Sequence, residues 1–386
     1  MTETAKMRRD APTRRHFLST GAAAAAVAGV CAPQVAFGRA GGKTIIKVFM
    51  RGGADGLLLF PKIDDDNYYA NHQGAAVPRP GSGPASEQAL IFPGRRRRSR
   101  ALNPNLAPLM EIWEDDNLMV SPATGFPENR RSHFEAQSQI SSATAGPEEQ
   151  GYLNRFLALR GFSDPFAGAV LGKRDMSKDL AGPRMVPVVA SPNQFGGAAY
   201  SNTALGRGLR LAAELLNAGE PLNAAAVDWQ GDWDSHTELV ARTDRPWTDQ
   251  NFRRNRDMAT GAGDLLTFYR ELRRMGRLRD VVVLVGTEFG RTIQINGSRG
   301  TDHGRGGAWF AFGGRIRNTF LGDAPLPDWI PPAQQRGDNP ARWLPDVVNY
   351  KDIAAEILVR HLGLGARDVG RVLPGWTWTP QNFLRG

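Results

Sequence analysis

Cysteine is almost absent from this chain, because Cys31 is the only one among its 386 residues. Cys31 lies within an N-terminal segment that carries the marks of a removable signal. The chain beyond that segment can have neither a disulfide nor a thiol nucleophile. Chemistry that depends on a cysteine is therefore excluded for the remaining part.

Long apolar runs are also missing, since the Ala-rich stretch 21–30 is shorter than the roughly 20 residues that a membrane-spanning helix needs. The pair Arg14 and Arg15 precedes this stretch, and small residues at Ala36 and Gly38 suit a signal peptidase. We therefore expect a twin-arginine signal peptide over 1–38, cleaved near Gly38, and one mature domain over 39–386. The export machinery of that route would be its partner, and a bacterial periplasm or the medium its location. The alternative is an ordinary N-terminal helix.

Acidic residues are outnumbered, and the formal net charge is +9. Residues 1–38 hold five basic and two acidic residues, which leaves about +6 for the mature part. This balance suits a small or polymeric anionic substrate. Arg95–Arg98 and Arg100 form the densest basic run, but no aromatic residue alternates with them. We therefore expect a solvated loop there and no nucleic-acid binding.

Strand-like and helix-like segments alternate along the chain, as in α/β proteins with a largely parallel sheet and helices on both faces. The predicted strands are 44–50, 117–121, 185–190, 224–229, 281–285 and 308–312, and the predicted helices are 106–113, 132–142, 205–217, 252–275 and 352–362. Ligands of such sheets bind beyond the carboxyl ends of the strands. Polar residues that directly follow strands are therefore the candidates for a site.

Carboxylates and imidazoles gather after three of these strands. The candidate metal ligands are Asp55, Asp234, His236, Glu288, Asp302 and His303. This mixture of oxygen and nitrogen donors suits Zn²⁺, Mn²⁺ or iron. The alternative is that each is an ordinary hydrogen-bonded polar residue.

A second feature lies at the start of helix 132–142. Ser132 and Glu135 have the spacing of a capping box, which would explain both without chemistry. Ser132 could instead be a nucleophile at the positive end of the helix, with Arg130 or Arg131 holding an anion. A third possibility is that His133 is the operative group.

Five motifs in order resemble the domain-of-unknown-function 1501 family, which is grouped with the alkaline phosphatase and sulfatase superfamily. They are RGGADGL at 51–57, SHFEA at 132–136, WDSH at 233–236, TEFGRT at 287–292 and DHG at 302–304. The resemblance implies an alkaline-phosphatase-like three-layer α/β sandwich. It also implies a metal site with Asp55 as the first ligand, Ser132 as the nucleophile, and Asp234, His236 and His303 as later ligands.

Two departures bear on the activity that the resemblance implies. Phe289 stands where the superfamily has a histidine ligand, so one of the two metal positions that the resemblance implies would lack a ligand. The chain would therefore hold either one or two ions, Zn or Mn. The lack of cysteine after Cys31 excludes a sulfatase that makes formylglycine from cysteine. We expect an exported, metal-dependent hydrolase of phosphate or related anionic esters. The alternative is a non-catalytic exported binding or assembly protein with a degraded metal site.

Overall fold

The computed structural model describes residues 42–94, 99–146, 148–190, 199–237, 239, 253–323, 325–327, 337 and 339–385. The predicted signal peptide 1–38 and Arg95–Arg98 lie outside these residues. Arg100 is described and, unlike the expected solvated residue, has a buried side chain whose Nε donates to Asp323 Oδ1 at 3.0 Å. Within the described ranges, no helix combines the length and apolar character that crossing a membrane requires.

A nine-stranded sheet forms the middle of the unit that spans 40–386. Its order is β10-β4-β9-β8-β1-β7-β5-β6, with β11 paired to β4. Within this sheet β9 runs antiparallel to both of its neighbours, β4 and β8, and the other pairs are parallel. The largely parallel sheet expected from the sequence is confirmed. The strands are β1 (Thr44–Met50), β4 (Leu118–Gly125), β5 (Gly168–Leu171), β6 (Val188–Val189), β7 (Ala224–Asp228), β8 (Val281–Thr287), β9 (Gly307–Gly313), β10 (Thr319–Phe320) and β11 (Val348–Asn349). The short strands β2 (Leu90–Ile91) and β3 (Ala101–Leu102) form a separate hairpin.

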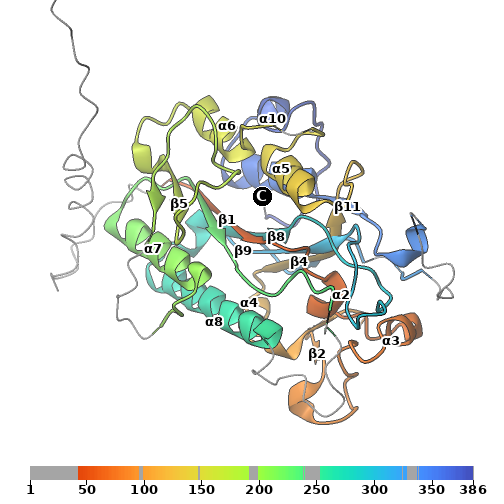
Figure 1. Cartoon of the computed structure of the whole chain (residues 1–386). Helices are drawn as coiled ribbons and strands as arrows, with labels where there is room; N and C mark the ends of the chain where they lie inside the picture. Colours follow the sequence, from red (N-terminus) through yellow and green to blue (C-terminus); the bar gives the residue numbers. More distant parts are fainter. Residues whose placement is uncertain are drawn as a thin grey trace, which may run out of the picture. The chain divides into compact units, whose positions relative to one another are not determined.

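Helices cover both faces of this sheet, which makes three layers (Figure 1). One face carries α4 (Leu109–Glu114), α7 (Ala204–Ala218) and α8 (Arg253–Arg274), and the other carries α5 (His133–Ser142), α6 (Tyr152–Leu159), α9 (Tyr350–Glu356) and α10 (Val369–Val372). The alternation of β1 explains the two cores, since Ile46 and Val48 pack in one and Ile45 and Phe49 in the other. The short helices α2 (Gly56–Leu59) and α3 (Asp66–Asn71) contribute to a third, smaller core.

The predicted elements are present with shifted ends. The predicted helix 106–113 begins later, as α4, and the predicted strand 185–190 is only the two residues of β6. Strand β8 continues to Thr287, two residues beyond the prediction, so Glu288 follows it directly. The predicted helix 352–362 is α9 followed by a π-helical turn over Ile357–His361.

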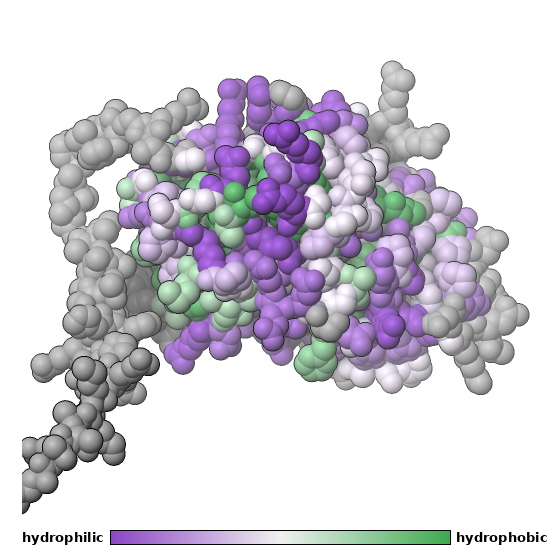
Figure 2. Space-filling model, turned by 90° about the horizontal axis from the view of Figure 1, so that it is seen from above, coloured by the Kyte–Doolittle hydropathy of each residue, from purple (hydrophilic) through white to green (hydrophobic). Residues whose placement is uncertain are grey.

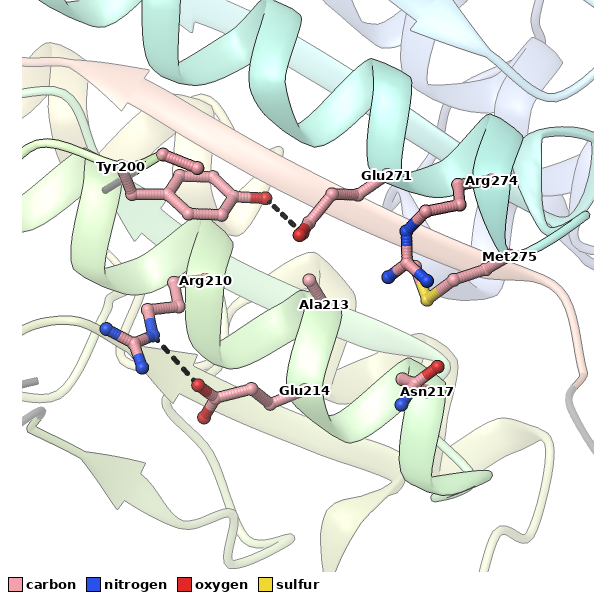
Figure 3. Close-up of a pocket in the computed structure, with 9 residues that line it drawn as sticks. Tyr200, Arg210, Ala213, Glu214, Asn217, Glu271, Arg274 and Met275 are labelled. Carbon is pink, nitrogen blue, oxygen red and sulfur yellow. Dashed lines mark hydrogen bonds and ion pairs between the residues drawn. The ribbon is translucent and has the colours of Figure 1, made fainter. Parts of the chain in front are cut away.

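A cavity of about 280 Å³ lies between α7 and α8, and no residue of the predicted site lines it (Figure 3). Its walls are tied by two side-chain contacts: Tyr200 Oη donates to Glu271 Oε2 at 2.6 Å, and Arg210 Nε donates to Glu214 Oε1 at 2.9 Å. The face seen from above is mostly hydrophilic, with scattered apolar residues (Figure 2).

The buried histidine of the π-helical turn makes stability depend on pH. His361 Nε2 lies 3.0 Å from the carbonyl oxygen of Thr44, and burial lowers the pKa of this imidazole to about 4. Between that value and the ordinary value near 6.5, the unfolded chain binds more protons than the folded one, so stability falls as the pH drops through this window.

When the pH is lowered from 7 to 4.5, we therefore expect the unfolding free energy of the wild type to fall by about 2–3 kcal/mol more than that of His361→Gln. Glutamine can still donate to Thr44 but gains no proton in this range. Urea unfolding at both pH values measures the difference. An identical pH dependence in both proteins would show that His361 does not titrate as stated.

Candidate metal centre

Most of the predicted site residues, though not Asp55, meet near the carboxyl ends of β7 and β8. Asp234 and His236 follow β7, and Glu288 follows β8. His133 is the first residue of α5, and His303 lies in the connection from β8 to β9, where an isolated bridge pairs it with Arg291. Segments far apart in the chain thus supply the side chains, as expected for a parallel α/β sheet.

His133 points its two ring nitrogens at two carboxylates. Nδ1 lies 2.7 Å from Glu288 Oε1, and Nε2 lies 3.4 Å from Asp234 Oδ2. Among the described residues, the buried Nε2 atom of His133 has no hydrogen-bond partner. The hydrogen bond to Glu288 raises the pKa of His133 above its ordinary value.

His303 has the same arrangement with different partners. Its Nδ1 lies 2.8 Å from the carbonyl oxygen of Arg131, which can only accept, so Nδ1 carries the proton. Its Nε2 lies 3.3 Å from Asp234 Oδ1. Burial lowers the pKa of this imidazole, which favours the neutral ring with a lone pair on Nε2.

His236 completes the group from the solvent side. Its Nδ1 lies 3.3 Å from Asp302 Oδ1, while its Nε2 lies 2.9 Å from His303 Nε2 and 3.2 Å from Asp234 Oδ1. With protons on both Nδ1 atoms, the two Nε2 lone pairs would face each other, so a cation or a proton must lie between them.

Three Nε2 atoms therefore converge on the carboxylate of Asp234. One ligand atom each from His133, Asp234 and His303 lie within 4.8 Å of one another, and His236 adjoins two of the three. Metal-binding histidines normally direct their other ring nitrogen to a carboxylate or carbonyl, as all three do here. The described residues thus fit a site for a divalent cation, with three imidazoles and one carboxylate as the possible ligands.

Arg291 holds the central carboxylate and is a residue to which we assigned no role from the sequence. Its buried guanidinium donates to Asp234 Oδ1, to the Gly52 carbonyl and, from Nε at 2.8 Å, to the Gly53 carbonyl. Burial opposes ionisation of Asp234, but the hydrogen bond and charge of Arg291 hold the pKa of this carboxyl at about 2. The only signal in the sequence was the place of Arg291 in the TEFGRT motif.

Gly52, in the loop after β1, allows the backbone of that loop to lie directly against the backbone of Asp234. Gly52 has a φ of 128°, and a Cβ there would lie 2.8 Å from the backbone nitrogen of Asp234. Only glycine accommodates both the conformation and the contact. This packing accounts for Gly52 within the RGGADGL motif.

Glu288 contacts His133 on the ring nitrogen that faces away from Asp234, and both of its carboxylate oxygens accept hydrogen bonds. Oε1 accepts from His133 Nδ1 and, at 2.9 Å each, from Gly52 N and Gln137 Nε2, while Oε2 accepts from Thr287 Oγ1 at 3.0 Å. Asp302 has a similar place behind His236 and also accepts from Asn296 Nδ2 at 2.9 Å. Each of these two carboxylates, which the sequence predicts as direct ligands, lies within hydrogen-bonding distance of an imidazole Nδ1 atom.

Asp55 does not join this group. Its Oδ1 accepts from the backbone nitrogens of Leu57 and Leu58 and caps α2, and its Oδ2 lies 3.4 Å from His72 Nε2. An aspartate before a helix is also a favoured N-cap, and here that role competes with ligation. Phe289 is buried, with its ring centroid 4.8 Å from that of His133 and 4.7 Å from that of His303.

Ser132 is the N-cap residue of α5, but its side chain makes no capping hydrogen bond within the described part of the chain. The predicted capping box is therefore not formed, and Glu135 is exposed. Arg131 has a φ of 62° and places its guanidinium 4.3 Å from the Trp343 ring centroid. Its carbonyl oxygen lies against His303 of the histidine cluster.

We expect Glu288→Ala to cost about 3–5 kcal/mol of unfolding free energy, because several buried donors lose their acceptor. His133 also loses the partner that orients it, so cation affinity should fall by about 10–100-fold. Denaturant unfolding and cation titration measure the two effects. Glu135→Ala, on the same helix but exposed, is the matched control. If both variants behaved alike, Glu288 would have no such role.

Comparison with solved structures finds proteins to which this chain is similar at low sequence identity. A protein in the alkaline phosphatase superfamily from Vibrio parahaemolyticus is 10% identical, with a TM-score of 0.41, over 72% of this chain and 62% of that chain. The C-terminal periplasmic domain of EcEptC from Escherichia coli, in complex with Zn, is 9% identical over 71% and 73% of the two chains, with a TM-score of 0.37. The lipoteichoic acid synthase LtaP from Listeria monocytogenes is 12% identical over 74% and 70%, with a TM-score of 0.38.

This chain thus spans about three fifths of the length of the Vibrio protein. No curated protein matches it. Residues 190–325 match the model of a family described as "Protein of unknown function (DUF1501)", which is the family that the sequence motifs resemble.

Proposed function

We propose that the chain is a metal-dependent hydrolase of phosphate or related anionic esters. The observation that carries this proposal is the convergence of three Nε2 atoms on Asp234, with each Nδ1 atom already hydrogen-bonded. His133, Asp234, His236 and His303 would hold a divalent cation, zinc or manganese. When bound, such a cation supplies Lewis acidity to an ester oxygen and favours ionisation of a nearby hydroxyl.

Ser132 is the proposed nucleophile. It directly precedes the ligand His133 at the N-terminal end of α5, where backbone N–H groups favour an anion, and its hydroxyl is not used as a cap within the described residues. Arg131, beside it, is the proposed partner of an ester oxygen, with Trp343 supporting its guanidinium. The substrate would be a small or polymeric anion.

We also propose that residues 1–38 direct export by the twin-arginine route to the periplasm or the medium. The pair Arg14 and Arg15, the apolar stretch and the small residues before Arg39 support this proposal. Amino-terminal sequencing of the exported protein should begin near Arg39. A first residue of Met1 or Thr2 on exported protein would contradict cleavage there.

A second candidate function is cation-dependent binding or assembly without catalysis. Four protein side chains surround the proposed cation site, whereas catalytic zinc sites usually keep one position for water or substrate. Phe289 also removes a ligand that the superfamily uses, which favours this alternative further.

Elemental analysis of protein purified without chelators, followed by turnover assays with phosphate and sulfate monoesters, tests both candidates. A bound cation with cation-dependent turnover supports the hydrolase. A bound cation without turnover on any ester favours the binding protein. Protein that takes up no cation at any concentration contradicts the proposed site.

A further inference from the structure

Two cationic side chains share one carboxylate beside the proposed metal centre. Asp228 is the last residue of β7, and its Oδ2 accepts from Lys173 Nζ at 2.9 Å and from Arg51 Nε at 3.1 Å. Arg51 Nη2 also donates to Asp228 Oδ1 at 3.2 Å, which makes this contact bidentate. Arg51 directly follows β1 and Lys173 lies two residues beyond β5, and both strands are parallel to β7. The cluster therefore lies at the carboxyl edge of the sheet, where parallel sheets bind their ligands.

Gln137 connects this cluster to the metal centre. Its Oε1 accepts from Arg51 Nη1 at 3.0 Å, and its Nε2 donates to Glu288 Oε1 at 2.9 Å. Because arginine can only donate, the amide oxygen must face Arg51 and the amide nitrogen Glu288. Glu288 Oε1 in turn lies 2.7 Å from Nδ1 of His133, a proposed ligand. One amide, one carboxylate and one imidazole thus separate the cluster from the proposed cation, so one substrate can contact both.

The cluster has more positive charge and more N–H groups than its own carboxylate uses. Two cations face the single charge of Asp228, and the nearby Asp179 is already paired with Lys47 in a buried ion pair. A guanidinium has five N–H groups and an ammonium three, and contacts within the described part of the chain use three of the first and one of the second. The Arg51 side chain is 32% exposed, so the cluster is open to an incoming ligand.

Arg51 is held in place before any ligand binds. Asp228 fixes one edge of its guanidinium, Gln137 accepts from its third nitrogen, and the Phe49 ring centroid lies 4.9 Å from its Cζ. A guanidinium fixed in this way loses little side-chain entropy when an oxyanion binds to it. A purely structural ion pair needs one cation for this carboxylate, and the second cation, Lys173, is the feature that points to an anionic ligand.

We propose that Arg51 and Lys173 form a second anion-binding subsite, and that the substrate carries a further phosphate or sulfate group besides the ester that reacts. The proposed cation would bind the reacting ester, and the subsite would bind the distant group. Phosphate and sulfate have several acceptor oxygens, which suits N–H groups that arrive from two different strands. The statement about the substrate rests on the proposed function, whereas the anion-binding subsite does not.

Lys173→Gln tests the proposal, because it removes one cation and leaves the contacts of Arg51 in place. Calorimetric titration at pH 7.5 compares glucose 1,6-bisphosphate with glucose 6-phosphate, which differ by one phosphate group. We expect zinc-loaded wild type to bind the bisphosphate about tenfold more tightly than the monophosphate, and Lys173→Gln to lose most of this preference, because a charge-assisted hydrogen bond is removed. Lys178→Gln is the matched control, since Lys178 is an exposed lysine of the same connection after β5. It should keep the preference.

Chelator-treated protein tests the subsite without the cation. There both probes should bind weakly and with similar affinity, through one phosphate each, and Lys173→Gln should weaken both by about tenfold. No binding of either probe, or binding that Lys173→Gln leaves unchanged, overturns the subsite. If this arm behaves as expected but the zinc-loaded wild type binds the two probes equally, the substrate with two anionic groups is overturned. Should the chain take up no zinc, the proposed function and the statement about the substrate fail together, while the chelator-treated arm still decides the subsite.

Discussion

Replacing His303 with alanine should weaken the binding of Zn²⁺ or Mn²⁺ by more than about 100-fold. Loss of an outer-shell partner already costs about 10–100-fold, and His303 is a proposed direct ligand. Its Nε2 faces both Asp234 Oδ1 and His236 Nε2, so its removal takes a donor from the middle of the cluster. Competition with a chromophoric chelator at pH 7.5 measures the affinity.

Thermal unfolding provides a second measure of the same event. A cation that binds only the folded chain adds about 2.7 kcal/mol of stability when its free concentration is 100 times its Kd. The wild type should gain this stabilisation and His303→Ala should not. His361→Gln is the matched control, because His361 is buried elsewhere and should leave cation binding unchanged. Equal cation affinity in His303→Ala and the wild type would contradict the proposed metal centre.

The α/β fold was predictable because its signals are local. β8 is a run of valine and leucine, and α7 has helical spacing with Thr203 as its N-cap and Gly219 at its end. The weaker element β5 escaped prediction, because its four residues are too few to show a pattern and its place depends on pairing with β7. The antiparallel direction of β9 likewise follows from long-range pairing with β4 and β8.

The candidate site was predictable in position but not in the role of each side chain. A carboxylate that follows a strand reaches the sheet edge whether it faces a cation, caps a helix or supports a histidine. In our proposal Asp234 faces the cation, whereas Asp55 caps α2 and Glu288 accepts a hydrogen bond from His133. The distinction depends on contacts between residues about 150 to 240 positions apart, such as Gly52 with Glu288. Spacing along one sequence does not contain that information.

Replacing Ser132 with alanine should lower ester turnover by about 10³-fold or more, with little change in stability. Removal of a nucleophile leaves only the contribution of binding and electrostatics to the rate. The melting temperature should stay within about 1 °C, because the hydroxyl makes no capping bond within the described residues. Steady-state kinetics on the best ester of the screen, with cation content checked for each protein, measures the effect.

Thr203→Ala separates this result from simple loss of a helix cap. Thr203 Oγ1 accepts from Gly206 N at 3.0 Å at the start of α7, so its removal should cost about 1 kcal/mol and leave turnover unchanged. The two variants should therefore show opposite patterns, one losing activity and the other stability. If Ser132→Ala retained full turnover while His133→Ala lost it together with the cation, Ser132 would have no role in the chemistry. The attacking oxygen would then have to come from water rather than from the chain.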